Sequence, residues 1–179
     1  MLHLTRSALP WNKTAAVATV RNDKIGSSVS IAVDVQFATK NRNRLPAKKQ
    51  IINWAKTALK GIREPAGLTV RIVDEDEGKI LNEHWRSGKK GPTNVLSFPA
   101  GNDAFGEPGY LGDIVVCAPV VLREAEQQGK SAPAHLAHMV IHGLLHLQGY
   151  DHENESDARV MEALEIEKLG QLGFKNPYN

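Results

Sequence analysis

Residues 142–152 constrain this chain more than any other stretch, because three histidines and a glycine occur there at defined spacing. His142 and His146 are four residues apart, so in a helix both imidazoles lie on one face, about 6 Å apart along the axis. Gly149 can adopt the left-handed conformation that ends a helix, which allows His152 to return as a third ligand. Three neutral imidazoles with an open fourth position are typical of a catalytic zinc site. The sequence therefore predicts one zinc ion per chain.

The same helix carries further histidines, and a histidine is usually just a hydrogen-bonded residue. His138 and His146 are eight residues apart, about 12 Å along a helix, so one ion cannot bind both. We therefore expect His138 to be a hydrogen-bonding or packing residue. Met161 lies downstream within a helical pattern, which favours core packing over a role beside the metal.

Metzincin proteases share the histidine spacing, in the motif H-E-x-x-H-x-x-G-x-x-H. Their glutamate, directly after the first histidine, is the general base for peptide hydrolysis. In this chain that position is Gly143. The sequence therefore has the metal scaffold without the proteolytic base.

Apolar periodicity predicts an α+β fold, with a small mixed four-stranded sheet, about five helices and the zinc site in the C-terminal helical part. The 179 residues suffice for a single domain with a core. The order strand, helix, strand, helix, strand favours parallel pairing, and we expect the fourth strand to be an antiparallel edge. The expected strands are 29–37, 69–73, 93–98 and 111–117, and the expected helices are 46–60, 75–86, 119–127, 131–148 and 155–172.

Residues 1–28 differ from the rest, with Asp23 as their one acid and no sustained apolar core of a signal peptide. We expect a poorly ordered, non-catalytic extension, with an organelle leader or an early start codon as alternatives, before a functional domain at 29–179. The single cysteine, Cys117, excludes an internal disulfide and fits a reducing interior. No apolar run is long enough to span a membrane. We therefore expect a cytoplasmic protein without a membrane partner.

Several strings resemble, in the same order along the chain, the signature of the YbeY family of bacterial rRNA-maturation endoribonucleases. The resemblance covers nearly everything from about residue 30 onward. The strings are AHLAHMVIHGLLHLQGYDH at 134–152, PTNVLSFP at 92–99, LGDIVVC at 111–117 and NPY at 176–178.

The resemblance implies a zinc-dependent, single-strand-specific endoribonuclease. It implies action on ribosomal RNA, notably at the 3′ end of the 16S RNA of the small ribosomal subunit, and in late ribosome quality control. The expected partners are therefore single-stranded RNA and the ribosome or its small subunit. The family's zinc ligands correspond here to His142, His146 and His152, and its functionally important arginine is matched to Arg71.

Arg71 lies in a strand whose alternate residues, Val70 and Ile72, are expected to face the core. Its own face is then expected to point toward the metal that the histidine helix presents. The planar guanidinium can contact two phosphate oxygens at once, which suits a catalytic role. The alternative is a surface arginine or a salt-bridge partner.

Net charge is only +2, but basic residues cluster in places, among them the loop that carries Lys89 and Lys90. Such clusters can hold an RNA backbone, although most are simply solvated loops. We expect Lys89, Lys90, Asn94 and Ser97 to contact RNA. Whether water or the ribose 2′-hydroxyl attacks is left open. Asp151 is either a partner for an imidazole N–H or a helix-terminal surface acid.

The sequence is also compatible with two rival functions. A metal-dependent hydrolase of peptides or amides would need a base from somewhere other than position 143. A non-catalytic ribosome-binding assembly factor with a structural metal would not need the open coordination position.

Overall fold

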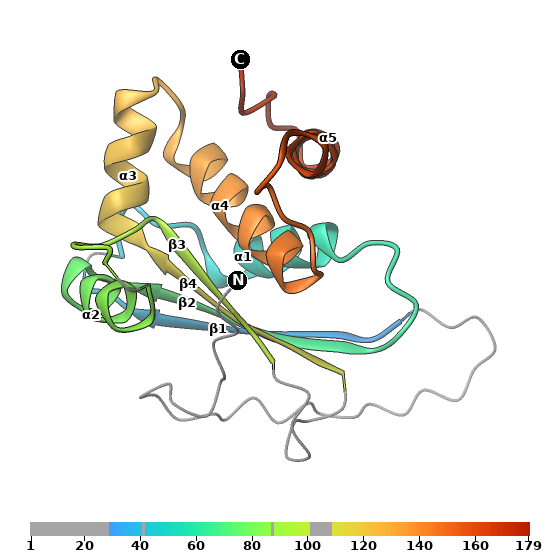
Figure 1. Ribbon diagram of the computed structural model, residues 1–179, viewed down its shortest axis with the longest axis horizontal. Helices are drawn as coiled ribbons and strands as arrows, with labels where there is room; N and C mark the ends of the chain where they lie inside the picture. The colour runs from blue at the N-terminus through green and yellow to red at the C-terminus, as the bar shows by residue number, and fades with distance from the viewer. Residues whose placement is uncertain (1–28, 41, 87, 101–108) are drawn as a thin grey trace.

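The computed structural model describes residues 29–40, 42–86, 88–100 and 109–179, which form one four-stranded sheet and five helices (Figure 1). The predicted α+β class and the single domain are confirmed. The extension predicted at 1–28 lies outside the described residues. Within the described ranges, no helix has the length and apolar character needed to cross a membrane.

The elements follow the predicted order and differ from it only at their ends, most at β2, which begins before Thr69. The helix Glu75–Trp85 follows the N-cap Asp74, whose carboxylate accepts hydrogen bonds from Thr39 and from the backbone of Lys40 rather than from the helix. The strands are β1 (Ile31–Ala38), β2 (Ala66–Val73), β3 (Val95–Pro99) and β4 (Tyr110–Cys117). The helices are α1 (Lys48–Ala58), α2 (Glu75–Trp85), α3 (Ala118–Gln127), α4 (Ala132–Leu147) and α5 (Glu155–Gln171).

The sheet has the strand order β1-β2-β4-β3, with β1, β2 and β4 parallel and β3 antiparallel to β4. The prediction that the fourth strand is the antiparallel edge is wrong, since β4 lies inside the sheet and β3 is the edge. Two features of the sequence explain this order. Almost every residue of β4 is buried, as expected for a strand covered on both faces. Strand β3 is short and ends at Pro99, which has no N–H to donate and is tolerated at an edge.

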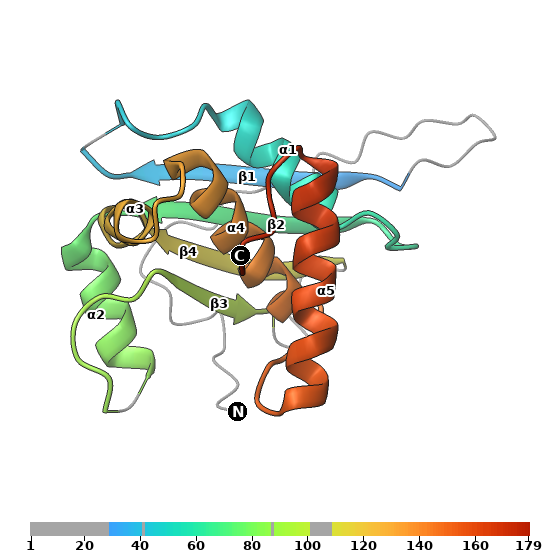
Figure 2. The same ribbon diagram turned by 90° about the horizontal axis from the view of Figure 1, so that it is seen from above.

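The two faces of the sheet pack against different helices. Figure 1 shows α1, α4 and α5 on one side, and Figure 2 shows α4 crossing the strands there. Val70 and Ile72 of β2 join the main core on this side, together with Leu144 of α4. On the other side, Val115 of β4 packs with Leu81 of α2 in a second, smaller core. The histidine helix and α2 therefore lie on opposite faces of the sheet.

Gly112 provides a test of the strand register. Its φ is 140°, and a Cβ at this position would lie 2.2 Å from the carbonyl oxygen of Phe98 on β3. We expect Gly112→Ala to lower the free energy of unfolding by about 2–5 kcal/mol, because backbone strain and overpacking add. Denaturant titration measures this loss.

Gly61→Ala is the matched control, because Gly61 has a φ of 103° and, apart from its neighbours in the chain, no other described residue has an atom within 4 Å of the added Cβ. This variant loses only the free energy of unfolding that comes from the unfavourable backbone conformation, about 1–2 kcal/mol. Equal losses in the two variants would contradict the close approach of β3 to Gly112.

Candidate metal centre

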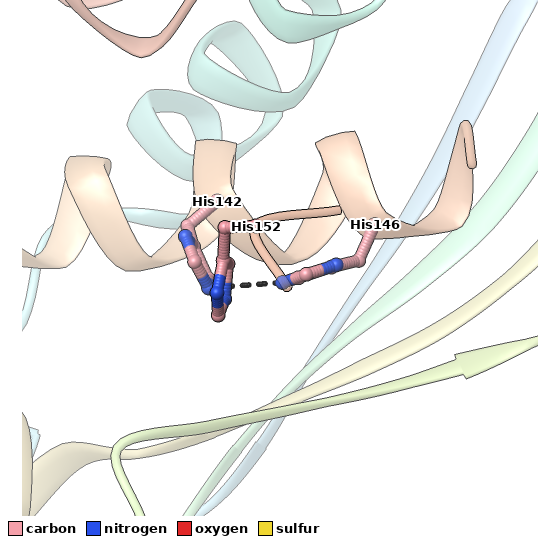
Figure 3. A group of neighbouring side chains, drawn as sticks. All are labelled: His142, His146 and His152. Carbon is pink, nitrogen blue, oxygen red and sulfur yellow. Dashed lines mark hydrogen bonds between the residues drawn. The ribbon is translucent and has the colours of Figure 1, made fainter. Parts of the chain in front are cut away.

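The three predicted histidines converge on one point (Figure 3). His142 and His146 project from α4, and His152 projects from the loop that follows it. One ring nitrogen from each lies within 4.8 Å of the others. The prediction that these side chains come together as a possible metal-binding group is confirmed.

A left-handed glycine returns the chain toward α4. Gly149 has a φ of 91°. Its N–H donates to the carbonyl of His146 at 3.0 Å, and the N–H of Tyr150 donates to the carbonyl of Leu145 at 3.1 Å. These two bonds form a Schellman motif, which ends the helix and reverses the chain. The reversal brings His152 beside the two helical histidines.

Hydrogen bonds on the far side of the rings fix which nitrogens face the centre. His142 Nδ1 lies 2.8 Å from a carboxylate oxygen of Glu165, and His146 Nδ1 lies 3.0 Å from the carbonyl oxygen of Tyr150. Both oxygens are acceptors, so both Nδ1 atoms carry hydrogen, and in the neutral rings both Nε2 atoms carry a lone pair. These two Nε2 atoms lie only 3.1 Å apart. Two facing lone pairs repel, so the arrangement fits a cation bound between them.

The electrostatic environment favours neutral ligands. Burial lowers the pKa of His146, and the neighbouring His142 and His152 lower it further. A neutral imidazole is the form that binds a metal. The residues present therefore fit a metal ion held by three histidine nitrogens.

Glu165 of α5 is a site residue that the sequence reasoning missed. Its carboxylate accepts from His142 Nδ1 at 2.8 Å, from His138 Nε2 at 2.8 Å and from the Tyr178 hydroxyl. Burial raises the pKa of Glu165, but these hydrogen bonds outweigh burial and hold the pKa at about 2. Burial and the adjacent Glu165 raise the pKa of the Tyr178 hydroxyl.

One signal in the sequence points to Glu165. It lies four residues after Met161 and four before Leu169, and both are buried in the core, as predicted for Met161. A glutamate at a core position of a helix needs buried donors. His138 supplies one of them and therefore has the hydrogen-bonding role expected for it. Asp151, which was considered as a partner for an imidazole N–H, accepts a hydrogen bond from the backbone N–H of His152 at 2.8 Å.

Gly143 faces the sheet rather than the metal centre. A Cβ there would lie 3.1 Å from Ile114 and 3.2 Å from both Ser97 and Val95. A glutamate at this position would have to push β3 and β4 side chains aside. The close packing explains why the residue after the first histidine is glycine, and it leaves no room for the proteolytic base of metzincins.

Arg71 does not lie where the sequence analysis expected it. It faces α2, on the side of the sheet away from the histidine helix, so the expected orientation toward the metal is wrong. Its guanidinium donates to both carboxylate oxygens of Glu77, at 2.7 and 3.1 Å, and to Gln36 at 3.0 Å. The physical reason is alternation, because Val70 and Ile72 fill the face that packs on α4. A catalytic role for Arg71 stays a prediction.

The four residues predicted to bind substrate fall into two groups. Lys89 and Lys90 are exposed in the loop between α2 and β3. Asn94 donates to both oxygens of Glu124 at 3.2 Å, and Ser97 donates to the backbone carbonyl of Gly143 at 3.0 Å. Asn94 and Ser97 therefore have internal contacts, and Ser97 fixes β3 to α4 beside His142.

Comparison with known proteins decides the family. The family model described as endoribonuclease YbeY matches residues 34–173. The chain belongs to the YbeY family. This membership confirms the predicted relationship and the prediction of an enzyme of the nuclease class.

Individual YbeY relatives match over most of their length. Endoribonuclease YbeY from Coxiella burnetii strain Dugway 5J108-111 is 48% identical over 155 residues, which cover 83% of this chain and 98% of the relative. The protein of strain RSA 331 matches to the same extent. Among solved structures, the solution structure of TM1509 from Thermotoga maritima is 28% identical, with a TM-score of 0.49. That match covers 79% of this chain and 91% of the other.

Metal content tests the histidine group. We expect the double change His142→Ala and His146→Ala to remove nearly all bound divalent metal, because one remaining imidazole cannot hold the ion. Elemental analysis of the purified protein measures this. His84→Ala, which removes an exposed histidine on α2, should leave the metal content unchanged. Full occupancy in the double variant would rule out this site.

Arg71→Lys distinguishes a catalytic role of Arg71 from a purely structural one. Lysine cannot make the two-pronged contact with Glu77, so we expect a loss of about 1 kcal/mol, or roughly 2–4 °C in melting temperature. If Arg71 acts only through this contact, RNA cleavage stays near the wild-type rate. Thermal melting and cleavage of labelled RNA are measured on the same samples. A loss of roughly a hundredfold in cleavage rate with unchanged melting would instead establish the catalytic role.

Proposed function

We propose that this chain is a zinc-dependent, single-strand-specific endoribonuclease that processes ribosomal RNA. The observation that carries the proposal is the pair of Nε2 atoms of His142 and His146, which lie 3.1 Å apart, with the Nδ1 atoms of both rings facing acceptor oxygens. His152 completes the group and is exposed. Membership of a family described as endoribonucleases supports the substrate class.

Zinc is the metal that this donor set favours. Three neutral histidine nitrogens are a common catalytic zinc set, and magnesium or calcium prefer oxygen ligands. Because His152 is exposed, the centre is open to a substrate. Zinc bound there supplies Lewis-acid chemistry at the scissile phosphodiester. The protein's own contribution is orientation, in which Tyr150 and Glu165 hold the rings of His146 and His142.

The edge of the sheet offers a path for RNA. The basic loop with Lys89 and Lys90 leads into β3, and β3 runs beside the histidine helix through the contact between Ser97 and Gly143. Exposed lysines attract phosphates without reading the sequence of bases. We propose Lys89 and Lys90 as backbone contacts. The internal contacts of Asn94 and Ser97 suit positioning of β3 better than direct binding.

The proposed biological substrate is the 3′ end of 16S ribosomal RNA, with the ribosome or its small subunit as partner and a role in late ribosome quality control. The likeness to the YbeY family supports this assignment, and ribosome maturation implies action in the cytoplasm. We further propose that residues 29–179 carry the activity. The family model matches within that range.

The two rival functions are less well supported. A peptidase needs a base next to the metal, and Gly143 packs against the sheet where the metzincin glutamate would stand. An assembly factor with a structural metal would be expected to close the fourth ligand position with a further side chain. Among the described residues, the metal-binding group consists of three histidines.

One set of incubations distinguishes the three functions. The zinc-loaded protein is mixed with labelled single-stranded RNA, the matching duplex and casein, each with and without a chelator. We expect cleavage of the single strand alone, loss of cleavage with chelator and recovery when zinc is added back. The variant with His142→Ala and His146→Ala, purified identically, controls for contaminating ribonucleases.

Each other outcome supports a different function. Cleavage of casein would favour the peptidase, and absence of any cleavage by fully zinc-loaded protein would favour the assembly factor. RNA cleavage that persists in chelator and in the double variant would contradict metal-dependent catalysis at this centre.

A further inference from the structure

We propose that Glu165 is the positioning residue of the metal centre, which fixes the ring of His142 so that its Nε2 lone pair points at the ion. The inference deepens the proposed function, because it rests on His142 being a metal ligand. It assigns a specific task to a residue on α5, outside the histidine motif.

The burial of Glu165 requires an explanation. Its side chain is 0% exposed, in the interface between α5 and α4. A charged carboxylate in such a place is costly unless several hydrogen bonds stabilise it. Met161 and Leu169, one turn before and after it, show that an apolar residue would suit the position. A role in packing alone therefore does not account for a carboxylate.

The contacts of Glu165 determine which ring nitrogen carries hydrogen in His138 and in His142. A carboxylate only accepts, so His142 must present Nδ1–H and His138 must present Nε2–H, each at 2.8 Å. The hydrogen bond holds the ring plane of His142 as well as its tautomer. The Tyr178 hydroxyl donates to the oxygen that His138 also contacts, which leaves the other oxygen to His142.

The opposite tautomer of His142 is incompatible with the centre. With hydrogen on Nε2, the ring would point an N–H at the metal and a lone pair at the carboxylate oxygen 2.8 Å away. Partners of this kind also raise the basicity of the ligand, and their loss typically lowers metal affinity by about 10–100-fold. His146 has its own partner in the Tyr150 carbonyl, so Glu165 acts on His142 specifically.

Another histidine of α4 that contacts a carboxylate, His135, provides a matched control. His135 lies 2.8 Å from Glu124, and His135 is buried, as Glu165 and His138 are. His135 is not one of the three histidines that converge. A change at Glu124 therefore alters a histidine–carboxylate contact of the same length, together with the contact of Asn94, without touching one of the three converging histidines.

The experiment compares zinc affinity among three variants of the full chain. Competition with a chromogenic chelator gives the dissociation constant, and thermal melting of the metal-free samples reports the fold. We expect Glu165→Gln to weaken zinc binding by about 10–100-fold, because an amide has one acceptor oxygen for two histidines. We expect Glu124→Gln to change affinity less than about threefold, even where its loss in melting temperature is similar.

Tyr178→Phe is a third variant, with an expected effect on zinc affinity between those of the other two. It removes one donor but leaves the bond between Glu165 and His142, so we expect a smaller loss of affinity than for Glu165→Gln. Unchanged affinity in Glu165→Gln, or an equal loss in Glu124→Gln, would overturn the proposal.

A measurement on the wild-type protein keeps the test independent of how well a variant folds. Long-range proton–nitrogen NMR spectra of the metal-free protein report which ring nitrogen of His142 carries hydrogen. We expect hydrogen on Nδ1, and hydrogen on Nε2 would overturn the proposal. Neither readout uses RNA, so a protein with tight, Glu165-dependent zinc binding but no ribonuclease activity would contradict the proposed function and leave this inference standing.

Discussion

Helix α4 lies so close to the sheet at Gly143 that even a methyl group there would press on Ile114 and on the side chains of β3. This close approach fixes the distance of α4 from the sheet and the rotation of α4 about its own axis. Eleven of its residues are buried, and Ser97 adds a hydrogen bond to the Gly143 carbonyl. Because His142 directly precedes Gly143 in the chain, the packing that builds the core also places the first of the three converging histidines.

Besides its apolar packing on the sheet, α4 needs polar partners for its histidines. The stripe of histidines on its other side has to be satisfied by acceptors from other elements, and the chain supplies Glu124 from α3 and Glu165 from α5. These carboxylates lie in interfaces that would otherwise be apolar. The helix is thus held between an apolar contact with the sheet and polar contacts with α3 and α5, which leaves it little freedom to rotate.

Local patterns in the sequence predicted most of the fold and the convergence of the three histidines, because periodicity and the histidine spacing depend on neighbouring residues. The turn at Gly149 is local in the same way, and its left-handed conformation was predictable. Contacts between distant residues were not. The place of β4 inside the sheet, and the side of β2 on which Arg71 meets Glu77, depend on which helix covers which face. Glu165 was visible only as a glutamate at a core position.

The partners of the two helical ligands lie at very different distances along the chain. His146 is held by Tyr150, four residues away, whereas His142 is held by Glu165, 23 residues away on another helix. The ring of His146 is therefore set as soon as α4 and its turn exist, but the ring of His142 is set only when α5 has docked. Binding of an ion by the three histidines and docking of α5 would favour the same orientation of the His142 ring, so each would strengthen the other to an equal degree. A metal held by the three histidines would then act as a tertiary cross-link between the last two helices, even though none of these histidines lies on α5.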